Sequence, residues 1–470
     1  MMNDLKPYPA MKDSGVSWIG DVPQHWEIKP LKRTFNILNG STPKSGEPSY
    51  WDGNILWATP EDLGKLSSVT LHTTRRMITQ EGYESCGTSL APEGSLLLST
   101  RAPIGHLAIA GVSLCTNQGC HCLVFQGNAE SNYYYYQLLI AKEELESWGQ
   151  GSTFKELSRD KLRVIRLASP PIDEQTAIVS FLDHADRQLR QYIRAKLKLI
   201  KLLEERKQVI VNCTVIRGLD PNVRLKPSGA EWLGDVPEHW ETKRCRYLFR
   251  EVDRRSLDGS EEHLSMSQRL GLVPSHLVEN RTLVSESNVG GKLCEVGDLV
   301  LNRLKAHLGV FAHARFAGVI SPDYTVLRPL EPDSAEYFEL VLRSPACRRE
   351  LRIRAKGIVE GFWRLYTDDL YDIRLPVPPF SERRAIIEHS RSAASEIDRV
   401  AHSAKREIGL LREYRLRLIA DVVTGKLDVR EAVANLPEEE VAHEKEEHAA
   451  ESDEVDADAE LEVAIEEVEG

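Results

Sequence analysis

Two stretches of this chain repeat one another closely, and the repeat limits the folds open to it. Residues 14–26 read SGVSWIGDVPQHW and residues 228–240 read SGAEWLGDVPEHW, so nine of thirteen positions are identical at an offset of 214 residues. Both copies keep two tryptophans and the run Gly-Asp-Val-Pro. A match of this quality does not arise by chance, and it predicts that one structural unit occurs twice.

A second repeat follows each of two variable regions. PPIDEQTAI at 170–178 matches PPFSERRAI at 378–386 at an offset of 208 residues, and the match continues to Leu219-Asp220 and Leu427-Asp428. The regions between the repeats diverge, although each keeps an apolar run that leads to a basic residue and a glycine turn. The organisation therefore alternates variable domains with constant segments. The predicted limits are variable domains at 1–169 and 221–377, constant segments at 170–220 and 378–436, and a tail at 437–470.

Each constant segment has the pattern of one long helix. Pro-Pro suits a helix start, no Pro or Gly occurs from 172 to 217, and Gly409 alone interrupts 380–424. A helix of about 40 residues spans about 60 Å. Apolar residues recur at spacings near three and four, as a packed helical seam requires. We expect the two helices to pack antiparallel against each other through a shared seam: Ile178, Leu182, Leu189, Ile193, Ile200, Leu203, Ile386, Ile397, Ile408 and Leu411. The alternative, that each helix packs on its own domain, fits this length less well.

The net charge divides unevenly along the chain. The formal value is −12, and residues 438–470 hold 16 acidic residues and Lys445, a net of −15. Subtraction leaves −12 − (−15) = +3 for residues 1–437, so the body is mildly basic. The tail is almost free of aromatic residues and is expected to be disordered.

Cysteine usage and hydropathy exclude several classes of protein. The eight cysteines form no C-x-x-C pair, and Cys120-His121-Cys122 is too tight for a zinc knuckle, so we expect reduced thiols and no metal. The N-terminus has no apolar signal-peptide core, and no apolar run reaches the roughly 20 residues of a membrane helix. These features predict a cytoplasmic protein without membrane contact.

In combination, the motifs resemble those of the DNA-specificity (S) subunits of type I restriction-modification enzymes. The resemblance covers residues 8 to about 430 and rests on both repeats, LLLSTRAPIGHLAIAG at 96–111, GSTFKELS at 151–158, GDLVLNRLKAHLG at 297–309 and SPDYTVLRP at 321–329. It implies an α+β fold with an internal pseudo-two-fold repeat. In such a fold, two α/β target-recognition domains are separated by two long antiparallel coiled-coil helices.

The resemblance also implies a function and partners. Each recognition domain would read one half of a bipartite, asymmetric double-stranded DNA target. The helices would set the spacer and dock two modification (methyltransferase) subunits, and through these the restriction (translocase-nuclease) subunits. The chain itself would catalyse nothing and bind no cofactor; S-adenosylmethionine, ATP and Mg²⁺ are expected in the partner subunits. One departure is Arg383, because Glu382-Arg383 stands where the first copy has Glu174-Gln175.

Reading DNA requires side chains that reach base edges, namely Arg or Lys for guanine and Asn or Gln for adenine, and loop residues that contact phosphates. The first variable domain offers these candidates: Thr42, Lys44, Arg75, Arg76, Arg101, Asn117, Gln118 and Lys155. The second offers these: Arg254, Arg255, Arg269, Arg303, Lys305, Lys356 and Arg364. The alternative for each residue is an ordinary solvated side chain.

Two enzyme classes and a scaffold are the competing interpretations. An amino-methyltransferase motif is incomplete in both copies, because 169–172 lacks the aromatic residue and 377–380 lacks the polar one. A metal-dependent nuclease could use Asp21 with 27–29, or Asp235 with 241–243, although each stretch also reads as a strand. Tyr133 to Tyr136 could stack on bases, but a packed helix is favoured. A pure coiled-coil scaffold would not explain why the two variable domains have diverged in sequence while the constant segments have not.

Overall fold

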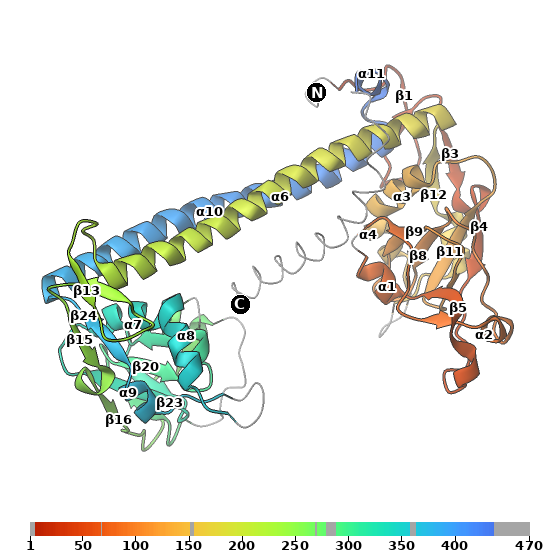
Figure 1. Ribbon diagram of the computed structural model, residues 1–470. Coiled ribbons are helices and arrows are strands. Elements are labelled where there is room, and N and C mark those ends of the chain that lie inside the picture. The colour runs from red at the N-terminus through yellow and green to blue at the C-terminus, as the bar shows by residue number, and fades with distance from the viewer. Residues whose placement is uncertain are drawn as a thin grey trace. The chain divides into compact units, whose positions relative to one another are not determined.

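The computed structural model describes residues 5–66, 68–150, 155–267, 270–278, 288–357 and 363–436 (Figure 1). These residues form two compact units. The first unit contains the residues up to Arg194 and those from Glu407 onward, and the second contains Ala195–Arg406. The acidic tail and the candidate Arg269 lie outside the described residues.

Two long helices are the longest elements of the chain. Helix α6 spans Ile172–Arg217 and helix α10 spans Phe380–Val423, and each begins directly after a Pro-Pro pair. Acidic residues in the first turn, Asp173 and Glu174 in α6 and Glu382 in α10, suit the positive end of the helix dipole. The predicted long helices are therefore confirmed, and the Pro-Pro pairs mark helix starts.

The first unit is built on a five-stranded sheet with the order β4-β11-β8-β9-β6. Its strands are Phe35–Asn39, Cys120–Phe125, Leu96–Ser99, Leu107–Ala110 and Thr70–Leu71. A three-stranded sheet joins β10 (Cys115–Thr116), β5 (Trp51–Ala58) and β7 (Met77–Ile78). Two-stranded pairs join β1 (Met11–Asp13) to β2 (Asp21–Pro23) and β3 (Glu27–Pro30) to β12 (Arg166–Ser169). The helices are α1 (Pro60–Gly64), α2 (Gln80–Glu84), α3 (Ser131–Ile140), α4 (Lys142–Ser147), α5 (Arg159–Val164) and α11 (Arg430–Ala434).

The second unit is built on a four-stranded sheet with the order β16-β23-β20-β21. Its strands are Phe249–Val252, Tyr324–Pro329, Leu299–Asn302 and Phe311–His313. Two-stranded pairs join β13 (Leu225–Pro227) to β14 (Asp235–Pro237), β15 (Glu241–Arg244) to β24 (Arg374–Val377), β17 (Leu264–Ser267) to β18 (Gly271–Pro274), and β19 (Lys292–Cys294) to β22 (Gly318–Ile320). The helices are α7 (Ala335–Arg343), α8 (Pro345–Arg354) and α9 (Thr367–Tyr371).

The repeat seen in the sequence is also a repeat of structure. Strand β3 pairs antiparallel with β12 from Glu27↔Ser169 to Pro30↔Arg166. Strand β15 pairs with β24 in the same register, from Glu241↔Val377 to Arg244↔Arg374. The central sheets share one order as well, because β4-β11-β8-β9 corresponds to β16-β23-β20-β21. The duplication therefore extends into regions whose sequences have diverged.

In each unit, a shorter helix of the domain packs against the end of a long helix. Tyr133 on α3 is fully buried and donates its hydroxyl hydrogen bond to the Val423 carbonyl at 3.2 Å. In the second unit, Tyr337 on α7 donates to the Val215 carbonyl at 2.9 Å. Tyr134 and Tyr136 are also buried, so the interpretation of the tyrosine run as a packed helix is confirmed.

Within each unit, early residues of one long helix meet late residues of the other, so the two segments run antiparallel. In the first unit, Asp186 of α6 pairs with Arg415 of α10, and in the second Lys207 pairs with Asp398 at 2.8 Å. Most of the predicted seam is buried: Ile178, Leu182, Leu189, Ile200, Ile386, Ile397 and Ile408. The other three predicted residues are half-buried: Ile193, Leu203 and Leu411. Among the described residues, no helix combines the length and the hydropathy of a membrane span.

Candidate nucleic-acid interface

Three segments that are far apart in the sequence meet on one surface of the first unit. The hydroxyl of Thr42 hydrogen-bonds to the Gln118 side chain. The indole N–H of Trp57 donates to the Ser41 carbonyl at 2.9 Å, and the Trp57 amide donates to the Arg76 carbonyl at 3.3 Å. The fold therefore joins the loop near residue 42, the segment at 75–76 and the turn at 117–118.

Close backbone approach holds this surface together. A Cβ atom on Gly40 would lie 1.8 Å from the Asn117 carbonyl oxygen, so only glycine fits there. The amide of Arg101 donates to the Gly119 carbonyl at 3.3 Å, and its guanidinium pairs with Glu156 at 3.3 Å. Six of the eight residues predicted for the first domain are thus linked to the 117–119 turn or to the cleft beside it: Thr42, Arg75, Arg76, Arg101, Asn117 and Gln118.

The cations of this surface differ in their partners. Arg75 pairs with Glu61 at 2.9 Å, and Arg101 pairs with Glu156. Lys44, Arg76 and Lys155 have no carboxylate partner among the described residues. The positive charges of Lys44, Arg76 and Lys155 are therefore available to an anionic partner, whereas those of Arg75 and Arg101 are already paired.

Arg76 is held by an aromatic pair. Its guanidinium carbon lies 3.6 Å from the centroid of the Trp51 ring, which is a cation–π contact. Trp51 is 7% exposed and meets Trp57 edge to face, with ring centroids 5.1 Å apart. The Trp51 indole also donates to the Lys44 carbonyl at 3.4 Å. An exposed arginine is therefore stacked on an anchored ring.

A cleft of about 660 Å³ opens beside this stack, and it is lined in part by Trp57, Thr59, Arg75, Arg76, His106 and Asn117. Asp62 on its wall accepts from the amides of Thr59 at 2.8 Å and Arg75 at 3.0 Å, so its charge is engaged. Burial, followed by the nearby Lys142, lowers the pKa of His106 and keeps that ring neutral at neutral pH. The cleft therefore combines apolar walls with donor groups.

The candidates of the second unit form two groups with more internal pairing. Arg303 donates to the Asp323 carbonyl at 2.8 Å, and Arg364 lies 3.4 Å from the Asp323 carboxylate. The backbone of Arg364 pairs with that of Lys356, whose ammonium lies 2.7 Å from Asp369. Lys305 follows Arg303 in the same turn and has no carboxylate partner among the described residues. The second group contains Arg254, which pairs with Glu295, and Arg255, which pairs with Asp253 at 3.2 Å.

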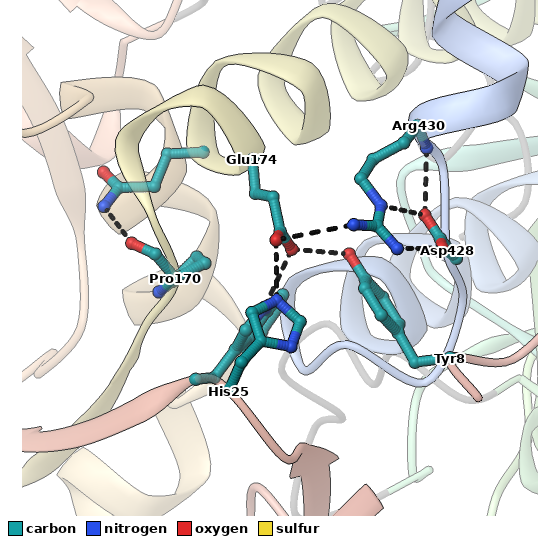
Figure 2. Close-up of polar contacts among 8 residues, drawn as sticks. Tyr8, His25, Pro170, Glu174, Asp428 and Arg430 are labelled. Atoms are coloured by element: carbon teal, nitrogen blue, oxygen red, sulfur yellow. Dashed lines mark hydrogen bonds and ion pairs between the residues drawn. The ribbon is translucent and has the colours of Figure 1, made fainter. Parts of the chain in front are cut away.

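A carboxylate that the sequence analysis did not single out joins four parts of the first unit (Figure 2). Glu174, in the first turn of α6, accepts from the Trp26 indole at 2.9 Å and the Tyr8 hydroxyl at 3.0 Å. His25 Nε2 lies 2.6 Å and Arg430 Nη1 lies 3.7 Å from the same carboxylate. We call these five residues the Glu174 node. They tie the N-terminal segment, the first repeat, α6 and α11 together.

The second unit contains a matching Glu382 node. Glu382 accepts from the Trp240 indole at 3.0 Å and contacts His239 Nε2 at 2.8 Å. Arg383, which stands where the first copy has Gln175, makes one equivalent contact. Arg383 Nε donates to the Pro378 carbonyl at 2.9 Å, and the Gln175 amide donates to the Pro170 carbonyl at 2.8 Å. The sequence signal for both nodes was His-Trp followed at a distance by Pro-Pro-x-x-Glu, present in both copies.

The residues proposed for a nuclease take part in strands. Glu27 and Lys29 of β3 form an ion pair at 2.6 Å, and Glu241 and Lys243 of β15 form one at 2.7 Å. The Lys29 hydrogen bond and charge lower the pKa of Glu27, as Lys243 does for Glu241. The interpretation of these stretches as the strand that follows each tryptophan is confirmed.

Comparison with known proteins shows which family part of this chain resembles. Residues 23–199 match the family model described as the type I restriction modification DNA specificity domain. The matched range contains the surface around residue 117, His25, Trp26 and Glu174 of the node, and the first part of α6. Residues 23–199 are therefore similar to a type I restriction modification DNA specificity domain.

Two similar proteins are specificity subunits of type I restriction enzymes. The MjaIX specificity subunit of Methanocaldococcus jannaschii is 34% identical over 189 residues, which is 40% of this chain and 43% of that protein. The chain thus spans less than half the length of this relative. The MjaVIII specificity subunit of the same organism is 19% identical over 429 residues, covering 87% of this chain and 94% of that protein.

The fold of this chain also resembles a solved structure. That structure comes from work on the complex assembly and conformational transition of the type I R-M system. One of its chains aligns with a TM-score of 0.63 at 15% identity, over 86% of this chain and 99% of that chain. At this identity the likeness shows a shared fold.

Proposed function

We propose that the chain is the specificity subunit of a type I restriction-modification complex and reads a bipartite, asymmetric double-stranded DNA target. The observation that carries the proposal is the repeated node. Trp26 with Glu174 and Trp240 with Glu382 anchor two domains in the same way. The recognition domains would be residues 1–169 and 221–377, each followed by a long helix.

The two domains are proposed to read different half-sites because their candidate surfaces differ. The first carries an arginine stacked on Trp51 and a glutamine-threonine pair beside the 117–119 turn. The second carries Arg303 and Arg364 around Asp323. Different donor groups contact different base edges, so the target would lack internal symmetry.

The long helices are proposed to dock two modification subunits, which would bring the restriction subunits. Several large apolar side chains on α6 and α10 are exposed, which is unusual unless a partner covers them. They include Tyr192, Leu202, Val209, Leu410 and Leu416. Methyl transfer and ATP-driven translocation would then occur in partners that hold S-adenosylmethionine, ATP and Mg²⁺, and this chain would perform no chemistry.

The proposal is tested by producing the full chain together with modification subunits of a type I system and mapping methylated bases by sequencing. Methylation is expected at one two-part sequence with a fixed spacer, and only when this chain is present. The purified chain alone should neither methylate nor cut DNA. Methylation at the same sites without the chain would overturn the proposal. So would Mg²⁺-dependent cleavage by the chain alone that Glu27→Ala or Glu241→Ala abolishes.

A further inference from the structure

We propose that Arg76 is a base-reading residue of the first domain and that it recognises a guanine through the cleft beside Trp51. This inference rests on the proposed function and assigns one position of the half-site to one side chain. It goes beyond general DNA contact, because a phosphate contact would carry no sequence information.

The choice of Arg76 follows from how the cations of this surface are occupied. Arg75 is paired with Glu61 and Arg101 with Glu156, so some of their guanidinium N–H groups are already engaged. Lys44 and Lys155 do not line the cleft, and each offers a point-charge ammonium in place of a planar guanidinium. Arg76 alone among the first-domain candidates combines a guanidinium, a place in the cleft lining and no carboxylate partner within the described residues.

The stack on Trp51 prepares this guanidinium for a planar target. A ring 3.6 Å from the guanidinium carbon restricts the rotation of the side chain, so less freedom is lost when it binds. The ring itself is fixed, because Trp51 is buried against Trp57 and its indole donates to the Lys44 carbonyl. Trp57 is fixed in turn by its bond to Ser41. The arginine is therefore oriented by the core of the domain.

The rest of the cleft suits a base edge that only accepts hydrogen bonds. The Asn117 side-chain oxygen already accepts from the Gly119 amide at 2.9 Å, which leaves the Asn117 amide N–H groups as donors. Glu61 and Asp62 are engaged by Arg75, so they do not compete as acceptors. In the major groove, guanine presents two neighbouring acceptors, N7 and O6, whereas adenine and cytosine present donors. The donors of Arg76 and Asn117 therefore favour guanine, which presents two neighbouring acceptors.

The test uses the full chain in complex with its modification subunits and compares Arg76→Ala and Arg76→Lys with the wild type. Binding is measured on target duplexes in which each position is changed in turn. At one guanine of one half-site, both variants are expected to lose about 5- to 140-fold of the discrimination against other bases. The lysine variant should keep the salt dependence of binding, because it keeps the charge.

Arg163→Ala is the matched control, since it removes an exposed guanidinium of the same domain that pairs with Asp160 and does not line the cleft. It should leave the base preference unchanged at every position. The inference is overturned if both Arg76 variants keep the wild-type preference throughout, or if they weaken binding equally at all sequences as a phosphate contact would. A wild-type complex that selects no bipartite target would instead overturn the proposed function, so the two failures are distinguishable. Thermal melting of each variant confirms that it is folded.

Discussion

Glu174 and Glu382 occupy equivalent positions, but they differ in environment. The side chain of Glu174 is 7% exposed and interacts with four groups, including Tyr8 and Arg430. The side chain of Glu382 is 26% exposed and interacts with His239 and Trp240. A buried carboxylate with several donors leaves more unsatisfied partners when it is removed. The first unit therefore depends more strongly on its node.

We predict that Glu174→Ala lowers the free energy of unfolding by about 3 kcal/mol, because it leaves the indole of Trp26 and the hydroxyl of Tyr8 unpaired in a buried site. The matched change Glu382→Ala should cost about 1 kcal/mol. Urea denaturation gives both values, and hydrogen exchange along the first turns of α6 and α10 assigns each loss to its unit. Equal losses at the two sites would contradict this difference.

Asp428, which pairs with Arg430 of the Glu174 node, predicts a pH dependence of stability. Asp428 accepts from Arg430 at 2.6 Å and 2.9 Å, and its amide donates to the Lys6 carbonyl at 2.8 Å. The hydrogen bond from Arg430 lowers the pKa of Asp428 below its ordinary value. A lowered carboxyl pKa contributes stability that is present above the unfolded pKa, about 4, and is lost as the pH falls through the folded pKa.

The stability difference between wild type and Asp428→Asn should therefore be constant from pH 7 to about 5 and shrink below about pH 4. Urea denaturation over this pH range measures it. Subtracting the variant removes the contribution of other carboxyl groups. A difference that stayed constant down to pH 2 would show that the Asp428 charge contributes nothing.

At the scale of elements, two glycines of the second constant segment have opposite roles. Gly425 follows the end of α10 with φ +75°, and a Cβ atom there would lie 2.3 Å from Pro23 and 2.9 Å from Trp26. Gly409 lies inside α10, and a Cβ atom there would meet nothing within 4 Å. The first position requires glycine for conformation and space, whereas the second gains nothing from it.

Gly425→Ala is predicted to destabilise the first unit by at least about 1–2 kcal/mol, from the left-handed backbone alone. Gly409→Ala should raise stability by about 0.5–1 kcal/mol, because alanine is the better helix former. Thermal or urea unfolding of both variants measures whether each substitution raises or lowers the free energy of unfolding. Destabilisation by Gly409→Ala would mean that this part of α10 packs more tightly than the structure has it.

The long helices could be predicted from the sequence because their causes are local. The near-absence of Pro and Gly, the Pro-Pro starts and the apolar spacing all act within a few turns. The nodes could not be predicted, because Glu174 meets Tyr8 and Trp26 only through contacts 166 and 148 residues apart in sequence. The stack of Arg76 on Trp51 was missed for a similar reason. Trp51 and Arg76 lie 25 residues apart in sequence and are brought together by the pairing of β5 with β7.

At the scale of the whole molecule, each long helix contributes to both units. The part of α6 up to Arg194 belongs to the first unit, and the part from Ala195 belongs to the second. Helix α10 is divided in the same way between Arg406 and Glu407. A change of length at these two points therefore leaves the internal contacts of each unit in place, including Asp186 with Arg415.

The final prediction is that the helices set the spacer of the DNA target. Matched insertions of about one helical turn, roughly four residues or 6 Å, are placed after Arg194 in α6 and after Arg406 in α10. Such insertions nearly preserve the seam, because four residues are close to a whole turn. At about 3.4 Å per base pair, the spacer should lengthen by about one or two base pairs, and both half-sites should stay unchanged.

Sequencing of the sites methylated by the reconstituted complex measures this outcome. Insertion into α6 alone is the control, because it shifts one helix against the other and should reduce methylation without producing a new spacer. Exchanging residues 27–169 for those of a relative should do the reverse of the paired insertion, changing one half-site and keeping the spacer. A half-site altered by the paired insertion, or a spacer altered by the exchange alone, would show that reading and spacing are not divided between domains and helices.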